Sequence, residues 1–545
     1  MARWATDDGR ASDGALWLKL DVVAELIPFG EAERFDERAA AEAAAFRGVR
    51  RPPARPTAFQ VAERSLFGVA DAAFAVALLP EEIMAHRVVD VRHRFRLLRY
   101  DEFRARHPDR ATEEPPPWKW RFRSNSYFLD RSEGSPKVQA LFRGQVAEVR
   151  TAAADLETSA VWAMDYLRRA VGEDGRFIYS YSPVANRVDT SYNMVRHAGT
   201  IYAMLELFGH EAADGRADPG LLGAADRATD YLVEQVRPCP RLRYERSEGA
   251  VPDHSRRHGL CMVEADESKL GGHGLAVLAL LQHPDIEDRP GRLEVAIGLG
   301  ERMVSVLQPD GQFDPHKVRW SDGTHIPYES EYYPGEAIYA LARLFRVTGE
   351  RRWLAAARQA SDYRVRVRYA EDGDFTDDTI PHDHWLAYGL RELAELDPRP
   401  WDEPYLRRLG RLIAEAQHGD DVDPPDWAGG FYEPPRSAPT ATRAEALGSI
   451  LTALGGPEAV SADEWKRLSD ALCRALAFQL RTQYTPARAF YTEEPQRSLG
   501  GVSGSLTDDE IRIDFPQHTS SSLVTAAVLM ERGSLSCQEQ HSVSH

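Results

Sequence analysis

The chain has 545 residues, of which 43% are hydrophobic and 28% charged, a composition typical of a water-soluble globular protein with a large core. Its 67 basic and 85 acidic residues give a formal net charge of −18, which argues against a nucleic-acid partner. No apolar run reaches about 18 residues, so we expect neither a membrane-spanning helix nor a membrane partner.

The N-terminal segment and the cysteines bear on location. Residues 1–14 lack a basic region followed by an apolar stretch, so they do not read as a secretory signal, and the cytoplasm is the default expectation. The cysteines contain no C-x-x-C pair and are too sparse for a disulfide framework. We therefore expect reduced thiols at Cys239, Cys261, Cys473 and Cys537.

Residues 1–150 predict an irregular α+β region. Residues 16–23 alternate as a strand or a short helix would, and the alanine- and glutamate-rich residues 34–46 favour a helix. Residues 118–128 and 138–149 are typical of strands. The region offers no independent clue to a substrate.

Six later segments share one design, in which polar residues lead into an apolar helical stripe. In the segment 189–208, for example, Ile201, Met204, Leu205 and Phe208 fall at i, i+3, i+4 and i+7. Six further helices with apolar stripes alternate with these segments. We expect them near residues 157–172, 221–236, 291–307, 351–367, 403–417 and 462–482.

Twelve helices in six hairpins result, with starts of the polar-capped helices roughly 50 to 75 residues apart. Six hairpins can close on themselves and bury every apolar face, whereas an open array would need polar capping repeats. The chain therefore resembles the six-hairpin (α/α)6 toroid superfamily, which includes glycoside hydrolases, polysaccharide lyases and sugar epimerases. We expect a mainly α fold: residues 1–150 as the α+β region, 151–535 as a catalytic toroid and 536–545 as a disordered tail.

The resemblance implies that the N-terminal ends of the inner helices surround a funnel that holds the active site. Helix N-termini carry unpaired N–H groups and a partial positive charge, which favour hydroxyl-rich or anionic ligands. Carboxylates at these ends could act as general acid and base. The candidates for catalysis are Glu331, Asp383, Glu267, Asp266 and Glu336.

Polar and aromatic side chains near the same helix ends are candidates for substrate binding. Arginine suits a bidentate contact with a carboxylate, histidine titrates near neutrality, and aromatic faces can stack on sugar rings. The candidates are Tyr192, Asn193, Arg196, His197, His273, Tyr333, His384, Trp385, Arg443, Gln517 and His518.

Each candidate also has a purely structural interpretation. Glu329, Ser330 or Asp266 could be a helix cap, Arg196 could form a structural salt bridge, and His197 could be a satisfied core histidine. The H-D-H run at 382–384 could suggest a metal, but residues at i and i+2 of a helix do not share a face, and no H-E-x-x-H motif occurs. We expect no metal and no other cofactor.

The favoured function is a carbohydrate-active enzyme that acts on a glycan by carboxylate acid/base catalysis, with glycoside hydrolysis the commonest activity that the resemblance implies. A uronic-acid epimerase or lyase is the alternative, with Arg196 or Arg443 neutralising the carboxylate of the substrate. A toroid that binds a glycan or peptide without catalysis is the third possibility, because the fold alone does not fix function.

Overall fold

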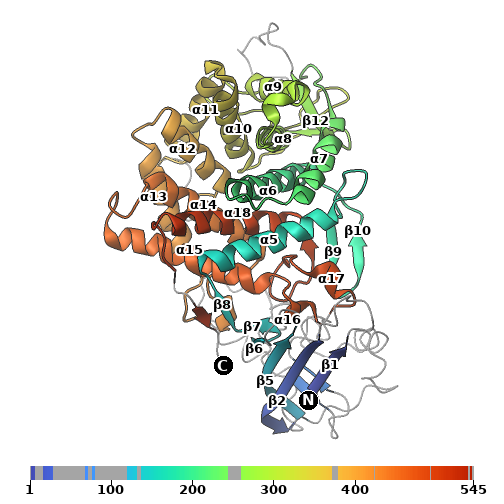
Figure 1. Ribbon diagram of the computed structural model, residues 1–545. Helices are drawn as coiled ribbons and strands as arrows, with labels where there is room; N and C mark the ends of the chain where they lie inside the picture. Colours follow the sequence, from blue (N-terminus) through green and yellow to red (C-terminus); the bar gives the residue numbers. More distant parts are fainter. Residues whose placement is uncertain are drawn as a thin grey trace.

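The computed structural model describes residues 2–6, 16–28, 68–70, 77–79, 120–131, 137–243, 259–370, 379–422, 424–490, 492–537 and 540–542. Within these residues, twelve long helices form a ring of six hairpins, and a β-sheet lies at one end of the molecule (Figure 1). None of the described helices is long and apolar enough to cross a bilayer.

Each hairpin pairs an outer helix with the inner helix that follows it. The outer helices are α5 (Ala153–Ala170), α7 (Pro219–Glu234), α9 (Pro290–Ser305), α11 (Arg351–Tyr363), α13 (Asp402–Glu415) and α15 (Ala462–Thr482). The inner helices are α6 (Met194–Ala213), α8 (Leu270–Leu281), α10 (Tyr333–Thr348), α12 (His384–Leu396), α14 (Ser437–Leu454) and α18 (Asp514–Glu531).

The inner helices close a complete ring. Each contacts the next, from α6 through α8, α10, α12 and α14 to α18, and α18 contacts α6. The expected (α/α)6 toroid is therefore confirmed. Inner helices are enclosed on most sides, and every residue of α8 is buried, whereas the outer α11 and α13 keep one polar face in water.

Glycines in the loops let the chain approach the next outer helix closely. Gly311 has φ 98°, and a Cβ there would lie 2.4 Å from the carbonyl oxygen of Gln359 in α11. Gly500 has φ 80°, and a Cβ there would lie 2.0 Å from the carbonyl oxygen of Trp162 in α5. Only glycine fits such positions. The contact at Gly500 joins the last loop of the ring to the first helix.

The N-terminal sheet is antiparallel, with β1 (Ala2–Thr6), β2 (Leu16–Pro28), β5 (Trp120–Asp130), β3 (Gly68–Ala70) and β4 (Ala77–Leu78) in that order. β6 (Lys137–Phe142) pairs with β5 and with β7 (Gln145–Val146). Of the two alternatives for residues 16–23, the strand is correct, and β5 covers most of the strand expected at 118–128. The stretch expected as a strand at 138–149 is divided among β6, β7 and β8 (Glu148–Arg150). The expected helix at 34–46 lies outside the described residues.

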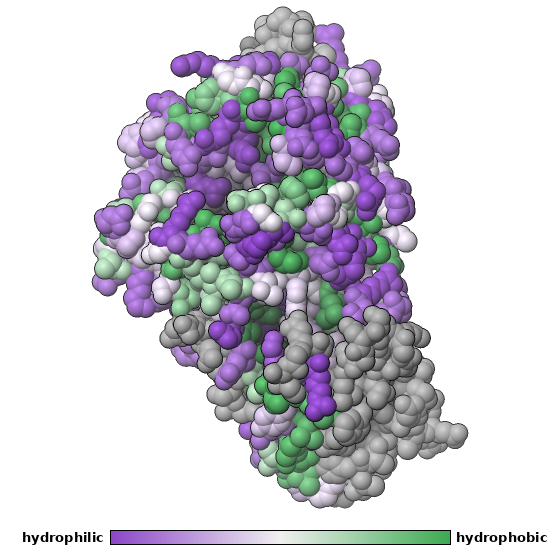
Figure 2. Space-filling view, in the orientation of Figure 1, coloured by the Kyte–Doolittle hydropathy of each residue, from purple (hydrophilic) through white to green (hydrophobic). Residues whose placement is uncertain are grey.

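A buried ion pair fixes the sheet to the toroid. Arg143, in the turn between β6 and β7, donates from Nε at 2.9 Å and from Nη2 at 2.6 Å to the carboxylate of Asp426 in the short 3-10 helix η4 (Pro425–Trp427). Within the sheet, β2 exposes the apolar side chains of Leu20, Val22 and Leu26. Figure 2 shows apolar side chains gathered on this sheet, while hydrophilic ones dominate the same view of the helices.

Short elements complete the loops between the helices. One small sheet contains β9 (Ser180–Ser182), β10 (Arg187–Asp189) and β15 (Ile511–Arg512). Another contains β11 (Val236–Pro238), β12 (Leu260–Glu264), β13 (Glu267–Lys269) and β14 (Lys317–Arg319). Further short helices are η2 (Ile286–Asp288), the π-helical η3 (Arg364–Arg368), α16 (Pro486–Ala489) and α17 (Pro495–Ser498).

Two expectations about the chain were wrong. The cysteines are not free thiols, because Cys239 pairs with Cys261 and Cys473 pairs with Cys537. Spacing could not show these pairs, since the fold brings together residues 22 and 64 positions apart. The end of the chain is also not simply a disordered tail, because β16 (Gln540–Ser542) pairs antiparallel with β8 (Glu148–Arg150).

Candidate active site

The N-terminal ends of the inner helices meet at one end of the ring, called here the helix mouth. Contacts around it link successive helices. Arg196 of α6 forms an ion pair with Asp514 of α18 at 3.0 Å, and His518 of α18 contacts Glu445 of α14. Arg443 of α14 donates to His382, two residues before α12, at 2.8 Å. All these side chains belong to the polar segments that lead into the inner helices in the sequence.

A carboxylate–imidazole pair occupies this end of the ring. His518 Nδ1 lies 2.8 Å from Oε2 of Glu445, whose other oxygen accepts a hydrogen bond from the Tyr388 hydroxyl at 3.2 Å. Glu445 is buried, so its charge depends on these partners. No hydrogen bond to Nε2 of His518 is found among the described residues, and the side chain is 12% exposed. The carboxylate therefore orients a ring whose second nitrogen can meet a substrate.

A second histidine stands beside this pair without a hydrogen bond of its own. The ring of His384, the first residue of α12, lies edge-on to that of His518 with centroids 5.1 Å apart. Its Nε2 is 3.8 Å from Glu445 Oε2, which is too far for a hydrogen bond. Both ring nitrogens are buried and lack a partner within the described chain. An unpartnered buried imidazole at a helix mouth needs an explanation, and a substrate can provide it.

The two imidazoles have opposite electrostatic environments. Burial, the nearby His518 ring and Arg443 hold the pKa of His384 well below its usual value. Burial acts the same way on His518, but the charge and hydrogen bond of Glu445, with the charge of Asp514, together outweigh it and raise the pKa of His518. Pairs of titratable groups whose pKa values are pushed apart mark acid and base assignments. At neutral pH these environments favour the protonated form of His518 and the neutral form of His384.

Two expected catalytic carboxyls, Glu336 and Asp383, are buried between α8, α10 and α12. Burial raises the pKa of both, to about 7 for Asp383, and the two charges repel. Asp383 uses Oδ1 to cap its own helix, accepting from the backbone N–H groups of Trp385 and Leu386. Oε2 of Glu336 and Oδ2 of Asp383 have no partner within the described chain. Asp383 is therefore a helix cap whose raised pKa also lets it hold a proton near neutral pH.

The other three expected carboxylates are engaged in ion pairs or turns. Glu331 accepts from Tyr369 at 2.7 Å and from Arg364 at 3.1 Å. Lys317 lies 2.7 Å from Glu267 and, by ion pair and hydrogen bond, holds the pKa of that carboxyl below its usual value.

Asp266 stands in the tight turn between β12 and β13, with φ 64°. It accepts from the backbone N–H and the hydroxyl of Ser321, both at 2.8 Å. Asp266 therefore joins two loops and does not cap a helix as its structural interpretation expected, since the N-cap residue of α8 is Lys269.

Several expected binding residues do lie at the helix mouth. Trp385 packs against His384 and His518. Asn193 caps α6, accepting from the Arg196 backbone N–H at 3.1 Å. The remaining three sit beside the same helix starts: Tyr192 beneath Arg176, Tyr333 beside Glu336, and Gln517 against Gly199.

Two expected binding histidines are core residues instead. His197 is fully buried, with Nδ1 2.7 Å from the Tyr192 hydroxyl and Nε2 2.9 Å from the Ala228 carbonyl oxygen. His273 is buried with Nε2 2.9 Å from the Ser268 hydroxyl, and burial lowers its pKa to about 3. For His197, the alternative of a satisfied interior histidine is the one that the structure supports.

Sequence reasoning missed Glu445 as a site residue, although it lies in the polar start of an inner helix. Its position gave one signal, since it is the only acid between Ser437 and Leu454 of α14. Nothing in the sequence shows that it faces His518. The reactive atoms of His384, Glu445 and His518 all lie within 4.8 Å of one another, a spacing that would also suit a metal ion.

No protein-family model matches the chain, and no curated protein matches it in sequence. Among solved structures, a cellobiose 2-epimerase from Bacillus thermoamylovorans B4167 is similar over 70% of this chain and 99% of its own, with 12% identity and a TM-score of 0.50. A cellobiose 2-epimerase from Spirochaeta thermophila DSM 6192 matches over 70% and 96%, with 16% identity and a TM-score of 0.47. An endoglucanase from the termite Nasutitermes takasagoensis matches over 69% and 99%, with 12% identity and a TM-score of 0.41. The first likeness shows the fold alone.

Proposed function

We propose that this protein is a carbohydrate-active enzyme that moves a proton at a sugar carbon next to a carbonyl group, as an epimerase or isomerase does. The observation that carries the proposal is the pair of imidazoles at the helix mouth, one held by a buried carboxylate and one without a partner. Proton abstraction from carbon needs both a base and an acid close to the substrate.

In this proposal the neutral His384 takes the proton from the carbon. The electron pair left behind forms a carbon–carbon double bond, and the carbonyl oxygen accepts the proton of His518, which gives an enediol. Glu445 stabilises the charged ring of His518 before the transfer and fixes its orientation. For the epimer, neutral His518 takes back the enediol hydroxyl proton and delivers it to the same carbon from the other face, after which His384 loses its proton to water and His518 regains one. For the isomer, His384 delivers its proton to the neighbouring carbon, and the hydroxyl on the first carbon gives its proton to neutral His518.

Glycoside hydrolysis, the function favoured by the sequence, is the second candidate. It needs two carboxyl groups across the substrate, one of them a protonated acid. Asp383, with a pKa of about 7, fits the acid role. Glu331 is less suited to the second role, because Arg364 and Tyr369 already bind it.

Solvent exchange separates the two candidates. We would incubate the protein in D2O with a panel of aldoses, cellobiose and uronic acids, and follow products by mass and by NMR. An epimerase incorporates deuterium at carbon without cleavage, and His518→Gln abolishes it. A matched control is His210→Gln, which changes a histidine that also faces a glutamate, Glu157, at 3.4 Å but at the opposite end of α6. Cleavage without deuterium at carbon would contradict the proposal and favour the hydrolase.

We also propose an oxidising compartment in place of the cytoplasm expected from the sequence. Two disulfides account for every cysteine of the chain. Such bonds persist outside reducing cytosol. Thiol titration of the unfolded, unreduced protein tests this, since four reactive thiols in material from the native source would contradict it.

A further inference from the structure

Arg443 differs from Arg196 and Arg364 of the helix mouth in its partners. Arg196 faces Asp514 and Arg364 faces Glu331, so each has a carboxylate from the protein. Arg443 is only 8% exposed, yet no carboxylate within the described chain lies within 4.0 Å of its guanidinium nitrogens. A buried charge without a counter-charge is costly.

The contacts of Arg443 hold its guanidinium in place without neutralising it. Nε donates to His382 Nδ1 at 2.8 Å, Nη1 to the Pro439 carbonyl oxygen at 3.0 Å and Nη2 to the Tyr432 hydroxyl at 2.9 Å. All three acceptors are uncharged, since burial, followed by the charge of Arg443, lowers the pKa of His382 to about 3. A guanidinium has five N–H groups, so two remain for a ligand.

Tyr432, which contacts the guanidinium of Arg443, reaches the surface. Tyr432 is 50% exposed and is held at φ 73°, a left-handed conformation that is strained for a tyrosine. Its carbonyl oxygen lies 2.8 Å from Nε2 of His418, which helps to fix this conformation. The ring faces the guanidinium at 4.9 Å. An exposed aromatic ring beside a fixed guanidinium is a surface on which a sugar ring and its acidic group could both bind.

Arg443 also lies close to the proposed acid/base groups. Its charge contributes to the low pKa of His384. His382, which it contacts, stands two residues before His384 in the chain. An anionic group on Arg443 would therefore place the rest of a sugar near the two imidazoles.

We propose that Arg443 is the receptor for a carboxylate of the substrate, so that the natural substrate is a uronic acid or a glycan that carries one. That the bound sugar reacts rests on the proposed function, whereas the binding of its carboxylate at Arg443 does not. A carboxylate supplies the missing counter-charge and matches the planar guanidinium with two oxygens.

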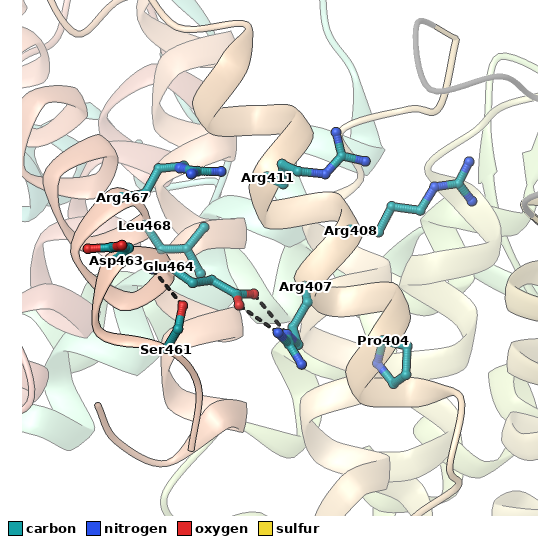
Figure 3. A pocket seen from close by; sticks show the side chains of 9 residues that line it. All are labelled: Pro404, Arg407, Arg408, Arg411, Ser461, Asp463, Glu464, Arg467 and Leu468. Atoms are coloured by element: carbon teal, nitrogen blue, oxygen red, sulfur yellow. Dashed lines mark hydrogen bonds and ion pairs between the residues drawn. The ribbon is translucent and has the colours of Figure 1, made fainter. Parts of the chain in front are cut away.

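Another arginine cluster was considered and carries no such proposal. A cleft of about 460 Å³ between α13 and α15 is lined by Arg407, Arg408, Arg411 and Arg467 (Figure 3). Figure 3 shows Arg407 bound by the carboxylate of Glu464, at 2.8 and 2.6 Å. Arg411 pairs with Glu415 at 3.2 Å. Carboxylates of the protein already bind Arg407 and Arg411, which makes Arg411 a suitable control.

The test is binding of D-glucuronate, D-glucose and D-glucose 6-phosphate, measured by calorimetry on wild type, Arg443→Met, Arg443→Lys and Arg411→Met. We expect glucuronate to bind more tightly than glucose, and Arg443→Met to weaken glucuronate about 30-fold or more, as for loss of one partner of a buried charge pair. Arg443→Lys keeps the charge and should lose less, and Arg411→Met should change nothing.

Each outcome of these measurements supports or overturns either the carboxylate receptor or the proposed function. Equal affinity of the wild type for glucuronate and glucose overturns the proposal without any variant, as does tighter binding of the phosphate than of glucuronate. If glucuronate binds through Arg443 but no deuterium enters any sugar carbon, the proposed function fails and the receptor stands. If uronic acids exchange deuterium equally well in wild type and Arg443→Met, the receptor fails and the proposed function stands.

Discussion

Replacing Glu445 by glutamine tests the acid role of His518 without changing the size of any side chain. The substitution removes one negative charge from a buried carboxylate whose Oε2 is 2.8 Å from His518 Nδ1. The glutamine keeps an oxygen that can accept the same hydrogen bond. The change therefore separates the charge of the partner from its geometry.

The magnitude follows from the type of hydrogen bond that is lost. A hydrogen bond to a charged group contributes about 1.5–3 kcal/mol, and a neutral one about 1 kcal/mol or less. If the charged bond disappears entirely, the rate of a step that needs protonated His518 falls about 10- to 150-fold, and retention of a neutral bond places the loss toward the lower end.

The pH profile carries more information than the rate at one pH. The carboxylate raises the pKa of His518, so in the wild type the protonated ring persists to higher pH than a free imidazole. Loss of the charge lowers that pKa, and the alkaline limb of kcat moves to lower pH. The acid limb, set by His384, should stay below the ordinary range of histidine, because burial holds the pKa of His384 low.

The assay is deuterium incorporation into the best substrate of the panel, measured from pH 5 to 9 for wild type and variant. Glu157→Gln is the matched control, because it changes a glutamate that faces His210 far from the helix mouth, and its profile should equal the wild type. An unchanged alkaline limb in Glu445→Gln, with His518→Gln inactive, would refute the assignment of His518 as the acid. Activity that is lost to a chelator and restored by zinc would instead identify the cluster as a metal site.

Three further predictions concern the scaffold. Arg143→Met should lower stability by about 3–5 kcal/mol, since it leaves Asp426 buried without its partner, and the double variant with Asp426→Leu should recover most of the loss. Gly500→Ala should lower the melting temperature, because its Cβ would meet a carbonyl oxygen at 2.0 Å in a left-handed backbone. Cys473→Ser should destabilise by about 2–4 kcal/mol, since the bond to Cys537 closes a long loop.

Calorimetry and chemical denaturation measure these changes. A double variant no more stable than Arg143→Met would show that the charge imbalance is not the cause of the loss. A normal melting temperature for Gly500→Ala would mean that the loop moves away from α5 at little cost. Equal stability of wild type with and without a reductant would contradict a contribution from the disulfides.

The ring could be predicted from the sequence because each helix carries its own apolar stripe. The outer helix expected at 462–482 is Ala462–Thr482, and the one expected at 221–236 is Pro219–Glu234. Periodicity is a local property, so it survives without knowledge of the neighbours. Periodicity does not show a change of helix type. The α-helix expected at 351–367 ends at Tyr363, and the chain continues as the π-helical η3.

The site was only partly predictable, because its chemistry depends on which helices become neighbours. His384 and His518 were expected as binding residues from their positions at helix starts. Glu445, the partner of His518, was not, since these two residues are 73 positions apart in sequence and meet only in the closed ring. Burial was equally hidden: His197 and Asn193 belong to one polar stretch, yet the histidine is fully buried and the asparagine caps the helix.

The closed ring also explains how two identical side chains, 5.1 Å apart, come to differ in charge. His384 is the first residue of α12, where burial, the nearby His518 ring and the charge of Arg443 disfavour a protonated imidazole. His518 lies one turn into α18, where α14 presents the Glu445 carboxylate to it. The difference therefore arises from position along each helix and from the order of helices in the ring. A second carboxylate on the His384 side would remove the difference, and with it the separation of acid from base that proton transfer at carbon requires.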